Sequence, residues 1–380
     1  MKKALINGCI FDGEVMCEGQ AVILQDNRVI ELVAENNVPD EVETCWDLGG
    51  HILAPGLIDI QVNGGGGVMF NDDPSVETLK IMGAAHRRFG TTGFLPTLIS
   101  TDADTMKQAI GAVEAAMSAG IPGVLGIHLE GPYLNSDKGG IHDSARFRTI
   151  DESAFELLTS LSKGRTLVTI APELTSDNMI KRLVERGVVV FGGHSAATYQ
   201  QTREALRSGM RGFTHLFNAM SPFQSRAPGM VGAALEDQHS WFGIIADGQH
   251  VHPASLSVAI AAKRRGYAVL VTDAMATVGS DIKKFSFEGI EIESVDGCCR
   301  TSSGALAGSD LDMLSAVRNT SRFTGIEQLE ALRMASCYPA RALGLEDRLG
   351  FIRPGFDASF IELDDDLNLY RSWINGEVSG

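Results

Sequence analysis

The sequence predicts an α/β fold, in which a (β/α)8 barrel is joined to a small β-sandwich built from both ends of the chain. Three observations predict it. Short apolar runs alternate with helical patterns over residues 53–346, and most of these runs end on a polar residue. Residues 1–52 and 347–380 instead carry only short strands and turns. Alternating strands and helices are typical of a parallel sheet covered by helices.

The bulk composition narrows the class of protein. A chain of 380 residues with 44% apolar and 21% charged residues can bury a large core. Its net charge of −16 argues against nucleic acid or an anionic membrane as a partner, although a few local cations could still bind a small anion. No run reaches the roughly 18 continuous apolar residues of a membrane span. Asn7 and Asp12 interrupt the first apolar run, which argues against a secretory signal, so we expect a cytoplasmic protein.

The cysteines show no framework spacing. There are six, without any Cys-x-x-Cys pair, and reduced thiols are the expected state: Cys9, Cys17, Cys45, Cys298, Cys299 and Cys337. The adjacent Cys298 and Cys299 could form a vicinal disulfide or part of a site for a soft metal, but the neighbouring sequence supplies no further ligand.

The two ends of the chain show the same pattern of short apolar runs and turns. Residues 4–8, 20–24 and 29–33 are apolar runs separated by turn residues, which is typical of a β-meander. Residues 358–361 and 370–374 repeat the pattern before the turn Asn375-Gly376. We therefore expect one β-sandwich domain from residues 1–52 and 347–380, and a barrel domain from residues 53–346.

Eight strands are expected in the barrel region, at residues 57–62, 93–99, 123–129, 166–171, 187–192, 211–216, 242–247 and 268–273. Helical patterns lie between them, and the clearest are residues 75–88, 103–119, 177–186 and 198–208. This order fits a TIM-type barrel. A doubly wound open sheet is the main alternative, but no Gly-x-Gly-x-x-Gly follows an early strand, so its nucleotide-binding form is unsupported.

The expected strands end on residues with reactive side chains. Active sites of such barrels lie at the carboxyl ends of the strands. The residues at or just past those ends are Gln61, Asn63, Thr97, Glu130, Glu173, His194, His215, Asp247 and Asp273. The pattern predicts one site assembled at one edge of the sheet.

Three of these residues could bind a metal ion. Glu130, His194 and His215 offer one carboxylate and two imidazoles, a set that suits Zn²⁺ or Fe²⁺ with an open position for water. Asp273 could take a proton from that water, although an aspartate in this position could also cap the next segment. The neutral amides of Gln61 and Asn63 are poor ligands, and we expect them to contact water or substrate.

Loop residues could complete the site. His142 and His250 follow expected strands and could either contact a substrate or stay solvated. Arg226 lies in a loop at the same end and would suit a phosphate or a carboxylate. Asn218 and Ala219 precede it. Residues 306–308, followed by Ser309-Asp310, resemble a loop that enters a helix, whose N-terminus could bind an anion or simply be capped.

Several motifs resemble one known family. Pro55-Gly56-Leu57-Ile58-Asp59 after a β-rich start, with Gly355 and Asp357-Ala358 near the end, resembles the amidohydrolase superfamily. Over essentially the whole chain, five motifs resemble the N-acetylglucosamine-6-phosphate deacetylases: Gln61-Val62-Asn63-Gly64, His128-Leu129-Glu130-Gly131-Pro132, Gly193-His194-Ser195, Thr214-His215-Leu216-Phe217-Asn218-Ala219-Met220 and Val271-Thr272-Asp273-Ala274.

The resemblance implies an activity and roles for residues. The activity is metal-dependent hydrolysis of N-acetyl-D-glucosamine 6-phosphate to D-glucosamine 6-phosphate and acetate, in amino-sugar catabolism and recycling. Glu130, His194 and His215 would bind the metal, and Asp273 would act as general base and acid. The implied substrate contacts are Ile141, His142, Asn218, Ala219, Arg226, His250, Leu306, Ala307 and Gly308. A homodimer is also implied, with Arg226 acting across the interface.

One departure from the wider superfamily concerns the number of metal ions. Many amidohydrolases carry His-x-His at the end of the first strand and bind two ions, whereas this chain has Gln61 and Asn63. We therefore expect one divalent ion per subunit, with zinc as the expected ion and iron, nickel, cobalt or manganese as alternatives. N-acetylgalactosamine 6-phosphate stays open as the substrate. A non-catalytic scaffold would typically have lost the metal ligands that this chain retains.

Overall fold

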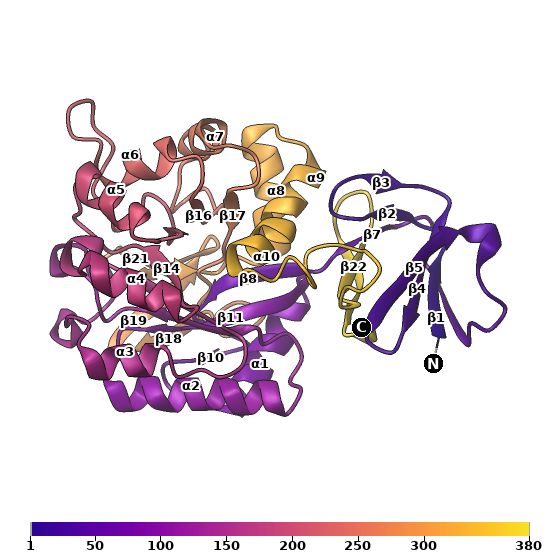
Figure 1. The fold of residues 1–380 in the computed structure, drawn as a ribbon, viewed down its shortest axis with the longest axis horizontal. Helices are drawn as coiled ribbons and strands as arrows, with labels where there is room; N and C mark the ends of the chain where they lie inside the picture. Colours follow the sequence, from indigo (N-terminus) through magenta and orange to yellow (C-terminus); the bar gives the residue numbers. More distant parts are fainter. Residues whose placement is uncertain (1, 380) are drawn as a thin grey trace.

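The computed structural model describes residues 2–379, so Met1 and Gly380, the outermost residues of the predicted terminal domain, lie outside the described residues. A barrel wrapped by helices lies beside a smaller region of β-strands that contains both ends of the described chain (Figure 1). Within the described chain, no helix is both long and apolar enough to span a membrane.

The barrel is an eight-stranded sheet in which every strand pairs in parallel with its neighbour along the chain. Its strands are β8 (Leu57–Val62), β11 (Thr91–Ile99), β12 (Gly126–Glu130), β13 (Arg165–Ile170), β14 (Val189–Gly192), β15 (Gly212–Phe213), β16 (Trp241–Ile244) and β17 (Ala268–Leu270). A parallel bridge between Val62 and Ala274 closes the barrel, supported by the bond from Asp273 N to Gln61 O at 3.0 Å. The predicted (β/α)8 barrel is confirmed.

At least one helix follows each strand of the barrel, and the helices cover its outside (Figure 1). They are α1 (Val76–Arg87), α2 (Ala103–Ser118), α3 (Glu152–Leu158), α4 (Asp177–Glu185), α5 (Tyr199–Arg207), α6 (Gly229–Glu236), α7 (Pro253–Ala262), α8 (Met313–Thr324), α9 (Gln328–Ala335) and α10 (Cys337–Leu343). Asp102 caps the N-terminus of α2, because its side chain accepts from Thr105 N. Helix α2 turns Met106, Ala109 and Val113 into the core, which holds it against the barrel.

The terminal strands form two sheets that face each other across a common core. One sheet contains β5 (Arg28–Ala34), β4 (Gln20–Gln25), β1 (Lys2–Ile6) and β6 (Thr44–Asp47). The other contains β24 (Glu377–Ser379), β23 (Leu369–Ile374), β22 (Phe360–Leu363), β7 (Ile52–Pro55), β2 (Cys9–Phe11) and β3 (Met16–Cys17). Leu5 and Val22 from the first sheet pack with Phe360 and Trp373 from the second. The predicted sandwich from both termini is therefore present. The boundary predicted at residues 52 and 53 falls inside β7, which belongs to the second sheet.

The segment after β17 corrects one prediction. Instead of a loop that enters a helix, residues 284–309 form a four-stranded antiparallel sheet, consisting of β18 (Lys284–Phe287), β19 (Ile290–Val295), β20 (Cys298–Thr301) and β21 (Leu306–Ser309). Helix α8 begins only at Met313, and the side chain of its own N-cap, Asp312, accepts from Ser315 N. That carboxylate caps the helix N-terminus, so of the two alternatives left open by the sequence the structure favours the cap over the anion site. The overlooked signals are alternating apolar residues and the turn Asp296-Gly297.

Shorter elements complete the chain. They are the two-stranded sheet β9 (Gly64–Gly65) and β10 (Val68–Met69), and the 3-10 turns η1 (Glu35–Asn37), η2 (Ser136–Lys138), η3 (Ser144–Arg146) and η4 (Pro172–Leu174). Turns η2 and η3 lie in the long loop after β12, whose residues reach over the carboxyl ends of the barrel strands.

Candidate active site

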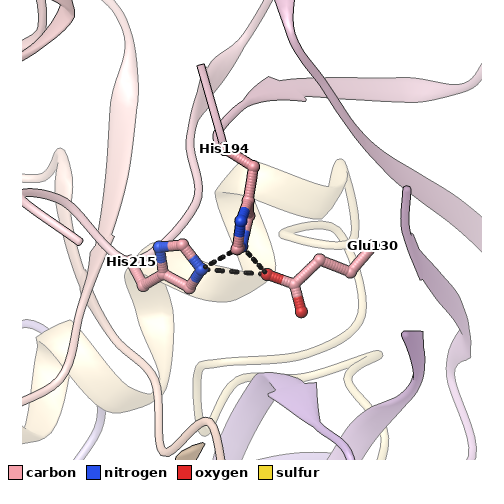
Figure 2. Close-up of side chains that lie close together, drawn as sticks. All are labelled: Glu130, His194 and His215. Atoms are coloured by element: carbon pink, nitrogen blue, oxygen red, sulfur yellow. Dashed lines mark hydrogen bonds and ion pairs between the residues drawn. The ribbon is translucent and has the colours of Figure 1, made fainter. Parts of the chain in front are cut away.

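Three buried side chains converge at the carboxyl ends of barrel strands. Glu130 is the last residue of β12, while His194 and His215 lie two residues past β14 and β15. Oε1 of Glu130 lies 3.2 Å from Nε2 of His194 and 2.9 Å from Nε2 of His215 (Figure 2). The two Nε2 atoms lie 3.0 Å apart. The predicted set of ligand atoms is thus brought to one point.

The backbone at the site explains how short strands present these side chains. His194, His215 and Asp273 have positive φ values of 48°, 29° and 53°. Such values are uncommon for residues other than glycine, and they cluster at functional sites. Each left-handed residue lies two or three residues past its strand, where the turn of the backbone brings its side chain to the cavity. The left-handed turns also explain why β15 and β17 are shorter than the strands expected at residues 211–216 and 268–273.

The hydrogen bonds of His194 indicate which of its nitrogens is free. Its Nδ1 lies 2.8 Å from the carbonyl oxygen of Lys138, which can only accept, so Nδ1 carries the proton. In the neutral ring, Nε2 then presents a lone pair toward Oε1 of Glu130. A carboxylate oxygen and an imidazole lone pair facing each other at this distance require a cation between them, and the donor set fits a divalent metal ion.

The charge state of Glu130 agrees with this role. Burial would raise the pKa of its carboxyl group, but the close contact with the imidazoles of His194 and His215 outweighs burial and holds that pKa well below its usual range. Glu130 is therefore an anion at neutral pH, as a metal ligand must be.

Asp273 faces these ligands and is held by two amides. Its Oδ1 accepts from Nδ2 of Asn63 at 2.7 Å and from Nε2 of Gln61 at 3.2 Å. The same Gln61 nitrogen lies 3.1 Å from Oε1 of Glu130. Asp273 therefore does not serve as a helix cap. Burial and the charge of Glu130 raise its pKa above the ordinary value, which favours a group that both accepts and returns a proton.

His142 lies above the ligands as a neutral hydrogen-bond donor. Its ring centroid is 4.4 Å from that of His194, and its Nδ1 is 2.8 Å from the Ser100 hydroxyl. The backbone N–H of Ser100 also points at Nδ1 over 3.4 Å, so Nδ1 is the acceptor and Nε2 carries the proton. Burial and the neighbouring His194 hold the pKa of His142 well below its usual range.

A cavity of about 180 Å³ lies over the site. Besides the metal-ligand set and Asp273, the predicted residues that line it are Asn63, Ile141, His142, Asn218, Ala219, His250, Leu306 and Gly308. Residues at or beyond the ends of seven of the eight barrel strands thus share one small chamber.

Three predicted residues do not line this cavity. Gln61 is buried beneath it, where its amide binds the two carboxylates instead of water or substrate. The side chain of Ala307 points away, into an apolar cluster with Met69 and Phe287. Arg226 is exposed and borders a different hollow, beside Thr198 and Tyr199.

A model described as the Amidohydrolase family matches residues 52–379, which is most of the chain. The chain belongs to the amidohydrolase family.

Relatives of this amidohydrolase include deacetylases of two amino-sugar phosphates. An N-acetylgalactosamine-6-phosphate deacetylase from Shewanella sp. (strain ANA-3) is 44% identical over 86% of this chain and 82% of its own. The structure of N-acetylglucosamine-6-phosphate deacetylase from Pasteurella multocida is 36% identical, with a TM-score of 0.96 and full coverage of both chains. A mutant of the Mycobacterium smegmatis enzyme in complex with N-acetyl-D-glucosamine-6-phosphate is 30% identical, with a TM-score of 0.90 and 99% coverage of each. These matches confirm the resemblance.

Several residues of this amidohydrolase's site were not singled out from the sequence. The Lys138 carbonyl and Ser100 fix the tautomers of His194 and His142, and Ile99 and Met275 supply apolar walls. Glu173, expected only as a strand-end residue, accepts from Ser195 Oγ at 2.6 Å and Ala196 N at 2.7 Å, which anchors the turn after His194. Ser100 had a signal of the same kind as Glu173, because it directly follows an expected strand.

Proposed function

We propose that this protein hydrolyses the acetamide of N-acetyl-D-glucosamine 6-phosphate to D-glucosamine 6-phosphate and acetate, in amino-sugar catabolism and recycling. The observation that carries the proposal is the convergence of Glu130, His194 and His215 opposite Asp273 in one cavity. The near-complete superposition on the Pasteurella multocida deacetylase supports the same reaction.

Asp273 would transfer the proton. A divalent ion held by Glu130, His194 and His215 would acidify a water molecule and polarise the acetyl carbonyl. Asp273 takes the proton from the attacking water and returns it to the amine nitrogen as the C–N bond breaks. Gln61 and Asn63 keep Oδ1 of Asp273 in place during both transfers, and the two hydrogen bonds that they donate both go to that oxygen.

His142 would stabilise the negative charge that develops on the acetyl oxygen. Its protonated Nε2 is the ring nitrogen that is free of Ser100. A neutral imidazole that stays neutral can donate this bond throughout the reaction, and removing such a donor commonly costs about 10²-fold in rate.

We propose one ion per subunit, with zinc as the expected metal and iron, nickel, cobalt or manganese as alternatives. The amides of Gln61 and Asn63 occupy the positions where a second ion would need ligands, and both donate to carboxylates. Removing the ion with a chelator should abolish acetate release, and one equivalent of divalent metal should restore it. Restoration that requires two equivalents would contradict a single ion.

The sugar phosphate would lie in the cavity among Ile141, Asn218, Ala219, His250, Leu306 and Gly308, with the backbone of Ala307 beside it. Because Arg226 lies outside the cavity of its own chain, we propose a homodimer in which Arg226 reaches the phosphate of the partner's substrate. Replacing Arg226 with Gln should raise KM for the phosphorylated sugar. A mixed dimer of Arg226→Gln and Asp273→Asn chains should regain activity only if the arginine acts in trans.

A second substrate has a specific observation in its favour, since a relative at 44% identity is an N-acetylgalactosamine-6-phosphate deacetylase. The two sugars differ at one hydroxyl group. Measured kcat/KM for both 6-phosphates decides which one the cavity prefers, and the unphosphorylated sugars serve as controls. A higher value for the galacto sugar would replace the main proposal by this alternative.

The deciding experiment is acetate release from N-acetyl-D-glucosamine 6-phosphate by metal-reconstituted protein, with Asp273→Asn as the matched control. Equal activity of both proteins would overturn the proposal. We further propose that the terminal sandwich and the barrel are separate domains and that the enzyme is cytoplasmic. The net charge of −16 favours a small-molecule partner over nucleic acid or a membrane.

A further inference from the structure

A second group of potential metal ligands lies outside the Glu130 site. Asp247 and His250 follow β16, while Cys298 begins β20, and their ligand atoms all lie within 4.8 Å of one another. The sequence next to Cys298 and Cys299 contains no further potential metal ligand. The fold supplies one by placing the antiparallel sheet against the loop after β16, where Arg300 donates to the Gln249 side chain at 3.2 Å.

The carboxylate and the imidazole of this group are already ordered. Oδ2 of Asp247 lies 2.6 Å from Nδ1 of His250, and both side chains are almost fully buried. Oδ1 of Asp247 accepts from the backbone N–H groups of Gln249 and His250, each at 2.8 Å. Two of the three ligands therefore lose little freedom when an ion binds.

The sulfur of Cys298 is not committed elsewhere. The residue is 1% exposed, and within the described chain its thiol makes only a long contact of 3.9 Å to the Cys299 carbonyl. A thiol of this kind is a weak donor, so this contact does not compete with a metal bond.

We propose that Asp247, His250 and Cys298 form a second metal site, which binds a thiophilic divalent cation such as Zn²⁺ or Cd²⁺. The set of one oxygen, one nitrogen and one sulfur ligand is typical of such ions. Zn–S and Zn–N bonds of about 2.3 and 2.0 Å place ligand atoms roughly 3.5 Å apart in a tetrahedral site, so movements of about 1 Å bring this group to coordinating geometry.

Binding at this site removes a proton. Burial and the charge of Asp247 raise the pKa of the Cys298 thiol to about 11, while Arg300 opposes the rise. The ion displaces the thiol proton, which passes to solvent as the metal–sulfur bond forms, and the proton that Nδ1 of His250 shares with Asp247 moves to Nε2 of the neutral ring. Affinity therefore increases with pH.

The site also reaches the substrate cavity, because His250 lines both. An ion inserted between Asp247 and His250 replaces their 2.6 Å contact and draws the ring toward Cys298. The ion thus inhibits by raising KM. This second part rests on the proposed function, whereas the binding itself does not.

The test is a Cd²⁺ titration of enzyme whose Glu130 site is already loaded with zinc. Cd²⁺ bound to a thiolate absorbs in the ultraviolet, and equilibrium dialysis counts the ions. We expect one additional ion with this absorption in the wild-type protein. Cys298→Ser and Cys298→Ala should bind Cd²⁺ at least tenfold more weakly and lose the signal. Cys45→Ser, which removes an exposed thiol, should retain both.

Equal Cd²⁺ binding and absorption in the Cys298 variants would overturn the site. In activity assays, Cd²⁺ should raise KM in the wild type and in Cys45→Ser but not in Cys298→Ser, whose activity without Cd²⁺ should match the wild type. Binding without any change in KM would overturn the inhibition alone. An inactive wild-type enzyme would contradict the proposed function, while the binding measurement would still decide the metal site.

Discussion

The side-chain amide of Gln61 donates a hydrogen bond over 3.2 Å to Oδ1 of Asp273. The same nitrogen lies 3.1 Å from Oε1 of Glu130, so one neutral side chain sets the distance between the proposed base and a proposed metal ligand. Histidine at this position would provide a ligand for a second ion, whereas the amide provides a fixed donor.

Replacing Gln61 with Ala removes one of the two donors to Asp273 and should lower kcat. A hydrogen bond to a charged group contributes about 1.5–3 kcal/mol, which predicts a decrease of roughly 10- to 100-fold. KM and the bound metal should change little, because Glu130, His194 and His215 remain. Steady-state kinetics and elemental analysis check this together. Loss of metal in the variant would mean that Gln61 supports the ligand rather than the base.

Replacing Asp273 with Asn should remove most turnover while metal stays bound. General acid–base catalysis contributes about 10²- to 10⁴-fold, and Asn can neither accept nor return the proton. The measurement is single-turnover acetate release with protein of confirmed metal content. Near-normal kcat would refute the role of Asp273.

The proposed role of His142 as a hydrogen-bond donor can be tested with one variant that keeps an N–H group and one that keeps only a ring of similar size. His142→Gln keeps an N–H donor and should lose about tenfold in kcat, while His142→Phe lacks the donor and should lose about 10²-fold or more. Because the pKa of His142 lies well below its usual range, neither variant should move the acidic limb of the pH–rate profile. Equal losses in both variants would argue for a purely steric role.

The buried carboxyl group of Asp59 should make the free energy of unfolding depend on pH. This residue is fully buried on β8, where it accepts from the Thr272 hydroxyl, and burial raises its pKa from 3.8 to about 7 against those hydrogen bonds. A raised folded-state pKa means that the folded protein binds the proton more tightly than the unfolded chain. The resulting stability is present below pH 4 and is lost as pH rises through 7.

At about 1.4 kcal/mol per pKa unit, the loss is on the order of 4 kcal/mol. Asp59→Asn has no proton to lose at this position. The difference in urea midpoint between wild type and Asp59→Asn should therefore shift in favour of the variant between pH 5 and 7.5, with both proteins saturated with metal. Parallel curves for the two proteins would show that Asp59 keeps an ordinary pKa.

Much of the barrel could be predicted from the sequence because its strands are continuous apolar runs. Strand β8 has the predicted bounds, residues 57–62. Strand β15 is only Gly212–Phe213, although the expected strand continued to Leu216, because the left-handed backbone of His215 turns the chain out of the sheet. The local order of apolar and polar residues does not predict that turn of the backbone.

The convergence of Glu130, His194 and His215 could also be predicted, since each lies at or just past the end of an expected strand. The contacts that depend on how side chains pack in the folded protein could not be predicted. Nothing in the spacing of Gln61 shows that it lies beneath the cavity, and nothing around Ala307 shows which side of β21 it faces. The exposed position of Arg226 likewise depends on the path of a loop.

Asp273 has a left-handed backbone, with φ of 53°, and at this position stability and activity favour different residues. Asparagine and aspartate both tolerate this conformation, but the neutral amide of asparagine would end the repulsion between Asp273 and Glu130 that helps to raise the pKa of Asp273. A selection for thermostability that ignores turnover should therefore enrich asparagine at position 273. The residue proposed to transfer the proton is thus one that selection for stability alone would replace.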